Sequence, residues 1–137
     1  MDNHTQPTSG RNSIQQLKSK AKILCEYRCS YTFEDAKERE IVDGVKRNGL
    51  ISEFVYELIA ILNGEDGNLR IGAAELLGLL TPPSLKNIVT DELEKHLTDE
   101  FARDYAYAGA QGDEEDIRTV AKAAEDAIHK LQLPEKS

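Results

Sequence analysis

The chain has 137 residues, of which 39% are hydrophobic and 31% charged, so it suits one globular domain and not a disordered protein. Its net charge of −8 repels phosphate backbones at long range, which disfavours nucleic acid as a main partner. The N-terminus lacks the apolar region of a signal peptide, and no apolar run approaches the ~20 residues that span a bilayer. We therefore expect a cytoplasmic protein that makes no membrane contact.

The apolar pattern predicts an all-α protein. Residues that favour helices dominate the composition, and no run alternates apolar and polar β-branched residues as a strand would. Residues 1–12 are polar and are expected to form a disordered arm, followed by a single helical-repeat domain over residues 13–133. The first helix of this domain is predicted over residues 13–27, where apolar side chains recur at helical spacing.

Capping residues and glycines set the limits of the next two helices. Thr32 and Asp35 resemble a capping box that starts a second helix, and Gly49 is expected to end it. Ser52 is a candidate cap for a third helix, which Gly64 ends.

The segment that follows is unusually apolar. A fourth helix starts after Asp66 or Asn68 and runs to the Thr-Pro-Pro sequence at residues 81–83, with almost no polar side chain over three turns. Such a helix must be covered on nearly all sides by its neighbours. Because glycine is unfavourable inside a helix, Gly72 and Gly78 indicate that other helices approach closely there.

The C-terminal part predicts further helices. A fifth begins at Ser84, and its apolar stripe either continues through Phe101 or gives way to a short helix capped by Thr98. After a loop, the last helix is expected over residues 114–131, ahead of Pro134. The chain is thus expected to form six or seven helices in consecutive antiparallel pairs.

The sequence contains an internal similarity between the segments that begin at Gly64 and Gly112. Both read Gly, two acids, two linker residues, an aliphatic residue and Arg, and both place Ala three residues after the Arg. The separation of 48 residues between positions 64 and 112 is near that of a two-helix repeat. Helix pairs of this kind stack because each has an apolar face too large to cover alone.

This pattern resembles the HEAT repeat family, most clearly over residues 58–80, although Gly64 and Gly112 stand where the family carries a loop Asp. The resemblance implies a short right-handed stack of about three antiparallel helix pairs, in which the repeat arginines pair with the acidic loops. A plain helical bundle is the alternative arrangement. The residues that the resemblance identifies as structural are Asp66, Arg70, Ala73, Leu77, Arg118 and Ala121.

The sequence offers no recognisable catalytic or cofactor site. Cys25 and Cys29 have no second Cys or His pair nearby, whereas structural zinc takes four ligands, so we interpret them as ordinary buried or half-buried thiols. The acidic loops lack the ligand spacing of an EF-hand, and no nucleophile or phosphate-binding motif occurs. We expect no enzyme activity, no cofactor and no metal. We interpret four acidic residues as a solvated face of the protein and not as an acid–base pair: Glu92, Glu94, Asp99 and Glu100.

Residues 101–111 lengthen the second repeat unit and are the predicted contact region. Insertions within repeats tend to map to one face, often the binding face, and tyrosines are enriched at interfaces. Alternatively, Phe101 and Tyr105 continue the core stripe. The residues expected to contact a partner are Tyr105, Tyr107, Glu114 and Glu115.

The expected function is a non-catalytic protein–protein interaction module of adaptor, regulatory or inhibitor (immunity-protein) type. Its expected partner is another protein or a second copy of the chain, which would make a homodimer. The alternative is a nucleic-acid-binding helical repeat with a local basic face in the N-terminal half. That face requires Lys18, Lys20, Lys22, Lys37, Lys46 and Arg47 to gather on one side.

Overall fold

The computed structural model describes residues 5–28, 35–102 and 119–133. The only strand-like contact in these ranges is one antiparallel bridge between Ala102 and Thr119. The prediction of an all-α fold is therefore confirmed for this part of the chain. Its elements are α1 (Thr5–Arg28), α2 (Asp35–Arg47), α3 (Ile51–Leu62), α4 (Gly67–Leu80), the 3-10 turn η2 (Pro83–Leu85), α5 (Lys86–Glu94) and α6 (Val120–Gln132).

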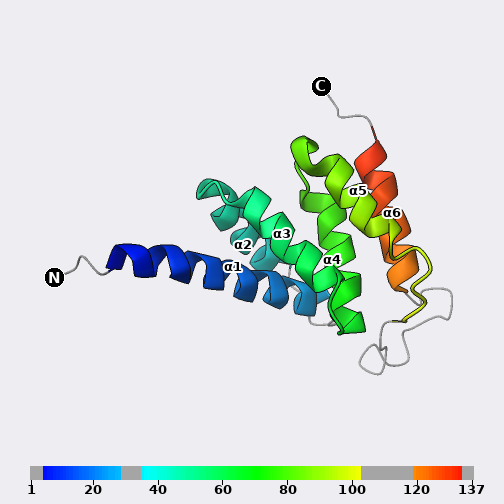
Figure 1. The fold of residues 1–137 in the computed structure, drawn as a ribbon, viewed down its shortest axis with the longest axis horizontal. Coiled ribbons are helices and arrows are strands. Elements are labelled where there is room, and N and C mark those ends of the chain that lie inside the picture. The colour runs from blue at the N-terminus through cyan, green and yellow to red at the C-terminus, as the bar shows by residue number, and fades with distance from the viewer. Residues whose placement is uncertain (1–4, 29–34, 103–118, 134–137) are drawn as a thin grey trace.

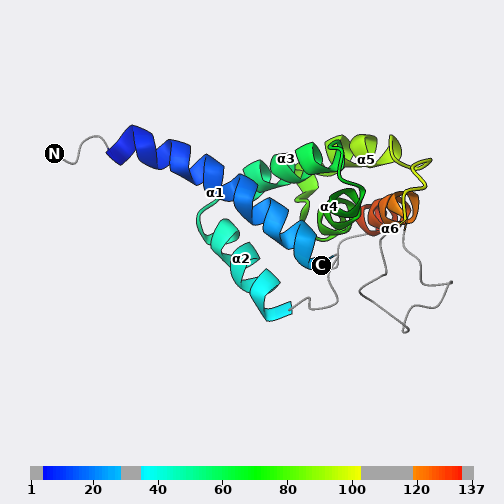
Figure 2. The same ribbon diagram turned by 90° about the horizontal axis from the view of Figure 1, so that it is seen from below.

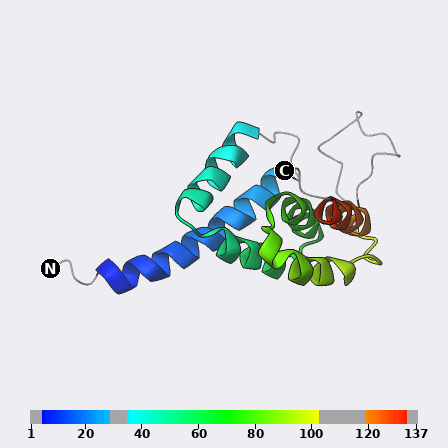
Figure 3. The same ribbon diagram turned by 90° about the horizontal axis from the view of Figure 1, so that it is seen from above.

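Three helices lie side by side in a central row formed by α1, α4 and α6 (Figure 2). Helices α3 and α5 cover one side of this row, and α2 lies on the other side of α1 (Figure 3). The N-terminal half of α1 projects beyond the other helices (Figure 1). Helix α4 occupies the middle and packs against α1, α3 and α6, which explains why its sequence is apolar nearly all round.

The predicted glycine contacts are present in α4. A Cβ atom added at Gly72 would lie 2.6 Å from the carbonyl oxygen of Cys25 in α1. A Cβ atom at Gly78 would lie 2.9 Å from the Cα atom of Ala127 in α6. The two glycines therefore allow α1 and α6 to reach the backbone of α4, as the sequence indicated.

The first two helices do not form a third pair equivalent to the others. Helix α3 packs against α4 and α5 packs against α6, as helix pairs would. In a regular stack, α2 would be the neighbour of α4, whereas here α1 lies along α4 and α2 contacts α1 and α3. The close approach at Gly72 gives the physical reason, since the flat surface there is occupied by the backbone of α1.

An ion-pair cluster at the end of α1 holds α2 and α4 together. The Nε of Arg28 donates to Oε1 of Glu38 at 2.9 Å, and its Nη1 donates to Oε1 of Glu75 at 3.4 Å. Burial acts to lower the pKa of the Arg28 guanidinium. The hydrogen bond and negative charge of Glu38, and to a smaller extent those of Glu75, outweigh this effect and raise the pKa. This cation therefore stays charged at the junction of three helices.

The core is made entirely of apolar side chains, because no polar or charged residue of the described ranges is buried. Phe54 and Leu58 of α3 and Leu76 and Leu77 of α4 are fully buried. Burying one such side chain stabilises the fold by about 1.5–3 kcal/mol. Cys25 is also buried, in agreement with its interpretation as an ordinary thiol, whereas Cys29 lies outside the described residues.

Two helix boundaries agree with the sequence-based prediction. Gly49 ends α2 with a φ of +70°, and the N–H of Leu50 donates to the carbonyl of Val45 at 3.0 Å, as in a Schellman motif. Asp66 begins α4, because its carboxylate accepts a hydrogen bond from the N–H of Leu69 at 3.2 Å.

The starts of α1 and α3 differ from prediction. Helix α1 begins at Thr5, so residues 5–12 are helical where we expected a disordered arm. Ser52 lies inside α3 and does not cap it, because the N-cap position is Leu50 and no side chain accepts a hydrogen bond there. None of the helices in the described ranges combines the length and apolar character that a membrane crossing requires.

Helix α6 begins at Val120 instead of near residue 114. Thr119 has an extended backbone, and its hydroxyl accepts the N–H of Lys122 at 3.0 Å, which makes it the N-cap. Because α4 begins at Gly67, a strict 48-residue repeat would start the last helix at position 115. The helix starts therefore do not follow the repeat spacing that the sequence suggested.

Candidate functional site

The predicted contact residues belong to the segment 103–118, which lies between two described parts of the chain. Residues 95–102 connect α5 to that segment, and α6 begins just after it. The candidate site consists of residues 95–102 and the first turns of α6, which lie on either side of that segment in the sequence. Lying outside the described residues are Tyr105, Tyr107, Glu114, Glu115 and Arg118.

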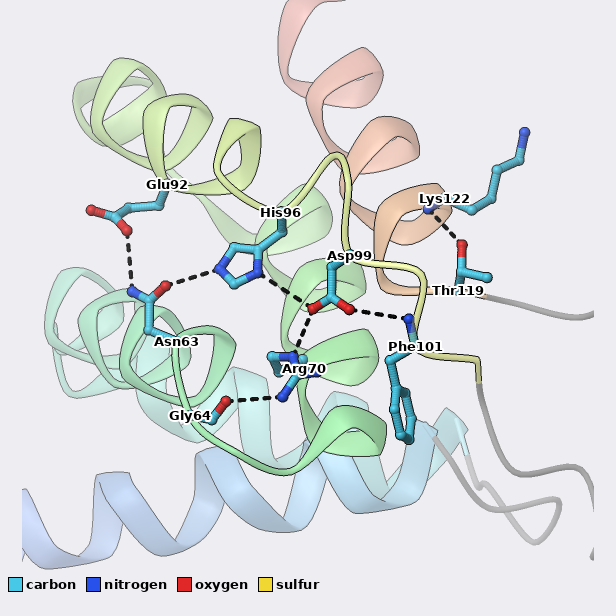
Figure 4. A network of polar contacts seen from close by, with 9 residues as sticks. All are labelled: Asn63, Gly64, Arg70, Glu92, His96, Asp99, Phe101, Thr119 and Lys122. Atoms are coloured by element: carbon cyan, nitrogen blue, oxygen red, sulfur yellow. Dashed lines mark hydrogen bonds and ion pairs between the residues drawn. The ribbon is translucent and has the colours of Figure 1, made fainter.

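Asp99 attaches residues 95–102 to α4. Its Oδ2 accepts a hydrogen bond from Nε of Arg70 at 2.9 Å, and its Oδ1 accepts one from the backbone N–H of Phe101 at 3.1 Å (Figure 4). Arg70 also donates from Nη1 to the carbonyl of Gly64 at 3.0 Å. One ion pair thus fixes the connection after α5 against the first turn of α4 and the corner between α3 and α4.

Backbone hydrogen bonds fix the same connection to α6. The N–H of Ala121 donates to the carbonyl of Asp99 at 2.8 Å, and the N–H of Val120 donates to the carbonyl of Phe101 at 3.0 Å. These N–H groups belong to the first turn of a helix, where no partner exists within the helix itself. The connection therefore supplies the carbonyl groups that complete the N-terminus of α6.

A second branch of polar contacts links α3 to α5 through Asn63. Its Nδ2 donates to Oε1 of Glu92 at 3.1 Å, and its Oδ1 lies 2.9 Å from Nε2 of His96 (Figure 4). Because a carboxylate only accepts, Asn63 must present its NH₂ group to Glu92 and its oxygen to His96, so Nε2 of His96 donates. The other ring nitrogen of His96 lies 3.8 Å from Oδ2 of Asp99.

Two carboxylates of this network have lowered pKa values. Burial acts to raise the pKa of Asp99, but the N–H of Phe101 and the guanidinium of Arg70 outweigh it and hold the pKa below the usual 3.8. The hydrogen bond from Asn63 is the main cause that lowers the pKa of Glu92 from 4.5. Both groups are therefore carboxylates at neutral pH, as their contacts require.

The structure corrects the roles expected for Arg70 and Asp99. Arg70 pairs with Asp99, 29 positions away, and not with the acidic loop at residues 65–66. Asp99 was interpreted as part of a solvated face, yet its side chain keeps only 22% of its exposure. Asp66 instead caps α4. Of the other predicted repeat residues, Ala73 and Leu77 are buried and Ala121 is half-buried at the start of α6.

Apolar side chains remain exposed around this anchored connection. Leu97 is 42% exposed and Phe101 is 40% exposed, so neither belongs to the core. The ring of Phe101 lies against Gly67 and 5.7 Å from the guanidinium carbon of Arg70. A cleft of about 380 Å³ adjoins this connection. We use the name loop surface for residues 95–102 together with the residues that line this cleft. That cleft is lined by Leu97, Thr119, Ala121, Lys122 and Glu125.

The loop surface combines apolar groups with charges of both signs, since Leu97 lies beside Lys122 and Glu125. Within the described ranges, no three His, Cys, Asp or Glu side chains converge as metal ligands would. In the network of Figure 4, Asp99 contacts both Arg70 and His96. On α6, Nζ of Lys122 lies 3.7 Å from Oε1 of Glu125.

Comparison of the chain with protein-family models, with curated proteins and with solved structures finds no match to any of them.

Proposed function

We propose that this chain is a non-catalytic protein-interaction module that binds a protein partner through the loop surface. The observation that carries the proposal is the anchoring of exposed Leu97 and Phe101 by the Arg70–Asp99 ion pair. Single exposed apolar side chains are common, so exposure alone carries little weight. A connection that is already ordered, however, loses little conformational entropy on binding, and this favours its use as a contact surface.

We propose that α3–α6 form two stacked, HEAT-like helix pairs in a right-handed arrangement, with α1 lying against α4 where a preceding pair would be. The packing of α3 on α4, α5 on α6 and α4 on α6 supports this view. In such a stack, the turns between helices gather along one edge, and the corner at Asn63 does meet the connection at Asp99 (Figure 4).

The competing nucleic-acid hypothesis receives less support from the N-terminal helices. It requires the lysines of α1 to share one face with those of α2. Lys18 lies 3.6 Å from Glu57 of α3, whereas Lys20 lines a cleft with Val45 of α2. Lys20 lies near the basic end of α2, at Lys46 and Arg47. Lys18 lies on the other flank of α1 and is paired with Glu57, so the full predicted set does not share one face. This distribution favours a protein partner over a phosphate backbone.

Affinity capture from native extract tests the proposal, with and without nuclease and with two matched variants. Leu97→Asp alters the loop surface, and Tyr56→Asp is its control because Tyr56 is 50% exposed on α3 and does not belong to that surface. We expect a stoichiometric protein partner that Leu97→Asp loses at least about tenfold in affinity and that Tyr56→Asp retains. Circular dichroism melts check that both variants stay folded.

Three results would contradict the proposal. One is capture of nucleic acid with steep salt dependence, since neutralised phosphates release counterions. Another is a partner that Leu97→Asp retains in full. The third is turnover of a small molecule by the purified chain.

A further inference from the structure

A second cleft lies at the other end of the molecule, between α1 and the corner that joins α2 to α3. Its volume is about 390 Å³, within the usual range for binding sites. Its apolar part consists of Leu17, Val45 and Leu50, of which the first two are buried. The polar residues that complete the lining are Gln16, Lys20 and Asn48.

The cleft carries positive charge that the described residues leave uncompensated. Lys18 on the other flank of α1 is paired with Glu57, but Lys20 has no ion-pair partner within the ranges the structure describes. No acidic residue lines the cleft, and Lys46 and Arg47 are exposed in the last turn of α2 next to it. The cleft therefore fits an apolar side chain that stands beside a carboxylate.

The chain presents such a pair on α5. Ile88 is 44% exposed, and Asp91 follows three residues later, which places both on one side of the helix. Asp91 is exposed and lacks an ion-pair partner among the described residues, whereas the neighbouring Glu92 is held by Asn63 and Lys95. Glu94 is exposed as well, but it lies six residues after Ile88 and on another side of the helix. Asp91 is therefore the exposed carboxylate of α5 that lies beside Ile88.

We propose that a second copy of this chain docks into the cleft, with its Ile88 on the apolar lining and its Asp91 on Lys20. Charge complementarity supports this occupant over others. No acidic residue lines the cleft and basic residues surround it, whereas α5 itself carries three acidic residues and one basic residue. The contact is separate from the loop surface, so it stands or falls independently of the proposed function.

The position of the two surfaces determines the kind of assembly. Helices α1 and α2 lie at one end of the molecule, and α5 lies towards the other (Figure 1, Figure 3). Because the cleft and α5 lie at separate ends, we expect a heterologous contact in which α5 of each copy enters the cleft of the next, so that the assembly continues from copy to copy. The chain is thus expected to form head-to-tail oligomers whose length increases with concentration.

Sedimentation velocity of the purified full chain tests this inference over a range of concentrations and salt. We expect the mean mass to rise past that of a dimer at low salt and to fall as salt screens the charges. Lys20→Glu and Asp91→Lys should each weaken association at least about tenfold, because like charges then face each other. Ile88→Ser should weaken it as well, and Leu97→Ser, which changes the loop surface, should leave it unaltered.

An equimolar mixture of Lys20→Glu and Asp91→Lys is the decisive measurement. The mixture contains one wild-type contact and one contact with exchanged charges, so the two proteins should assemble alternately although neither assembles alone. A monomer at all concentrations, a closed dimer, or a mixture that fails to recover the lost mass would overturn the inference. Equal losses from Leu97→Ser and Ile88→Ser would also overturn it.

Discussion

Replacement of Gly72 by alanine tests the packing of α1 on α4 most sharply. A Cβ atom there would lie 2.6 Å from the carbonyl oxygen and 2.8 Å from the Cα atom of Cys25. Ordinary contacts begin at 3.4 Å, and both neighbours are backbone atoms that no side-chain rotation can move. The substitution therefore requires the two helices to separate by several tenths of an ångström.

Two opposing effects set the size of the change. Alanine is about 1 kcal/mol more favourable than glycine inside a helix. Overpacking costs about 1–3 kcal/mol, and a gap of 0.5–1 Å along the interface forfeits a quarter to a half of each dispersion contact. Because the obstruction at Gly72 is backbone, we place its cost at the upper end, so Gly72→Ala should destabilise the fold by about 1–2 kcal/mol net.

Gly44 of α2 provides the matched control. A Cβ atom added there would meet only the end of the Arg47 side chain, at 3.8 Å. Gly44→Ala should therefore show the helix-propensity gain without the packing cost and should stabilise the fold by about 0.5–1 kcal/mol. The two variants make the same chemical change in helices of the same chain, so their difference isolates the contact with α1.

Urea unfolding and thermal melts followed by circular dichroism measure both variants. For a chain of this size, the expected changes correspond to a decrease of roughly 3–8 °C for Gly72→Ala and an increase of roughly 1–4 °C for Gly44→Ala. If Gly72→Ala is as stable as Gly44→Ala, the close approach of α1 to α4 is incorrect.

Three further predictions concern the core, the ion pair and a helix cap. Leu76→Asp places an unpaired charge at a fully buried position, which costs several kcal/mol, so the cooperative thermal melt of this variant should disappear. A melting temperature within a few degrees of wild type would show that α4 is not central. Asp99→Asn should lower stability at pH 7 by about 1–3 kcal/mol, because Arg70 loses a charge-assisted acceptor. Folding lowers the pKa of Asp99, so the stability that its carboxylate contributes is complete above pH 3.8 and is lost as the pH falls through the folded-state pKa. Urea unfolding at low pH should therefore show a smaller stability difference between wild type and Asp99→Asn than at pH 7. An unchanged difference would refute the pairing. Thr119→Ala removes the acceptor for the N–H of Lys122 and should cost about 1 kcal/mol in the same assay, whereas no loss would argue against this start of α6.

Local features of the fold were predictable from the sequence because they depend on short-range chemistry. The φ of +70° at Gly49 and the cap at Asp66 follow from residue type and position. The close contacts at Gly72 and Gly78 follow from the cost that glycine carries inside a helix.

Features that depend on the path of the chain were not predictable. Arg70 has acidic residues nearby in the sequence, and only the folded connection after α5 brings Asp99 closer to it. The position of α1 against α4 was missed because periodicity identifies an apolar face and does not identify its partner. The start of α6 was placed too early because acidic residues at 113–116 and Thr119 are both acceptable near a helix N-terminus.

Hydrogen–deuterium exchange on the captured complex tests the central claim, that the loop surface is where a protein partner binds. We expect partner binding to slow exchange in peptides that cover residues 95–102 and the first turns of α6, and to leave peptides from α2 unchanged. Protection confined to α1 and α2, with residues 95–102 exchanging as in the free chain, would contradict the claim.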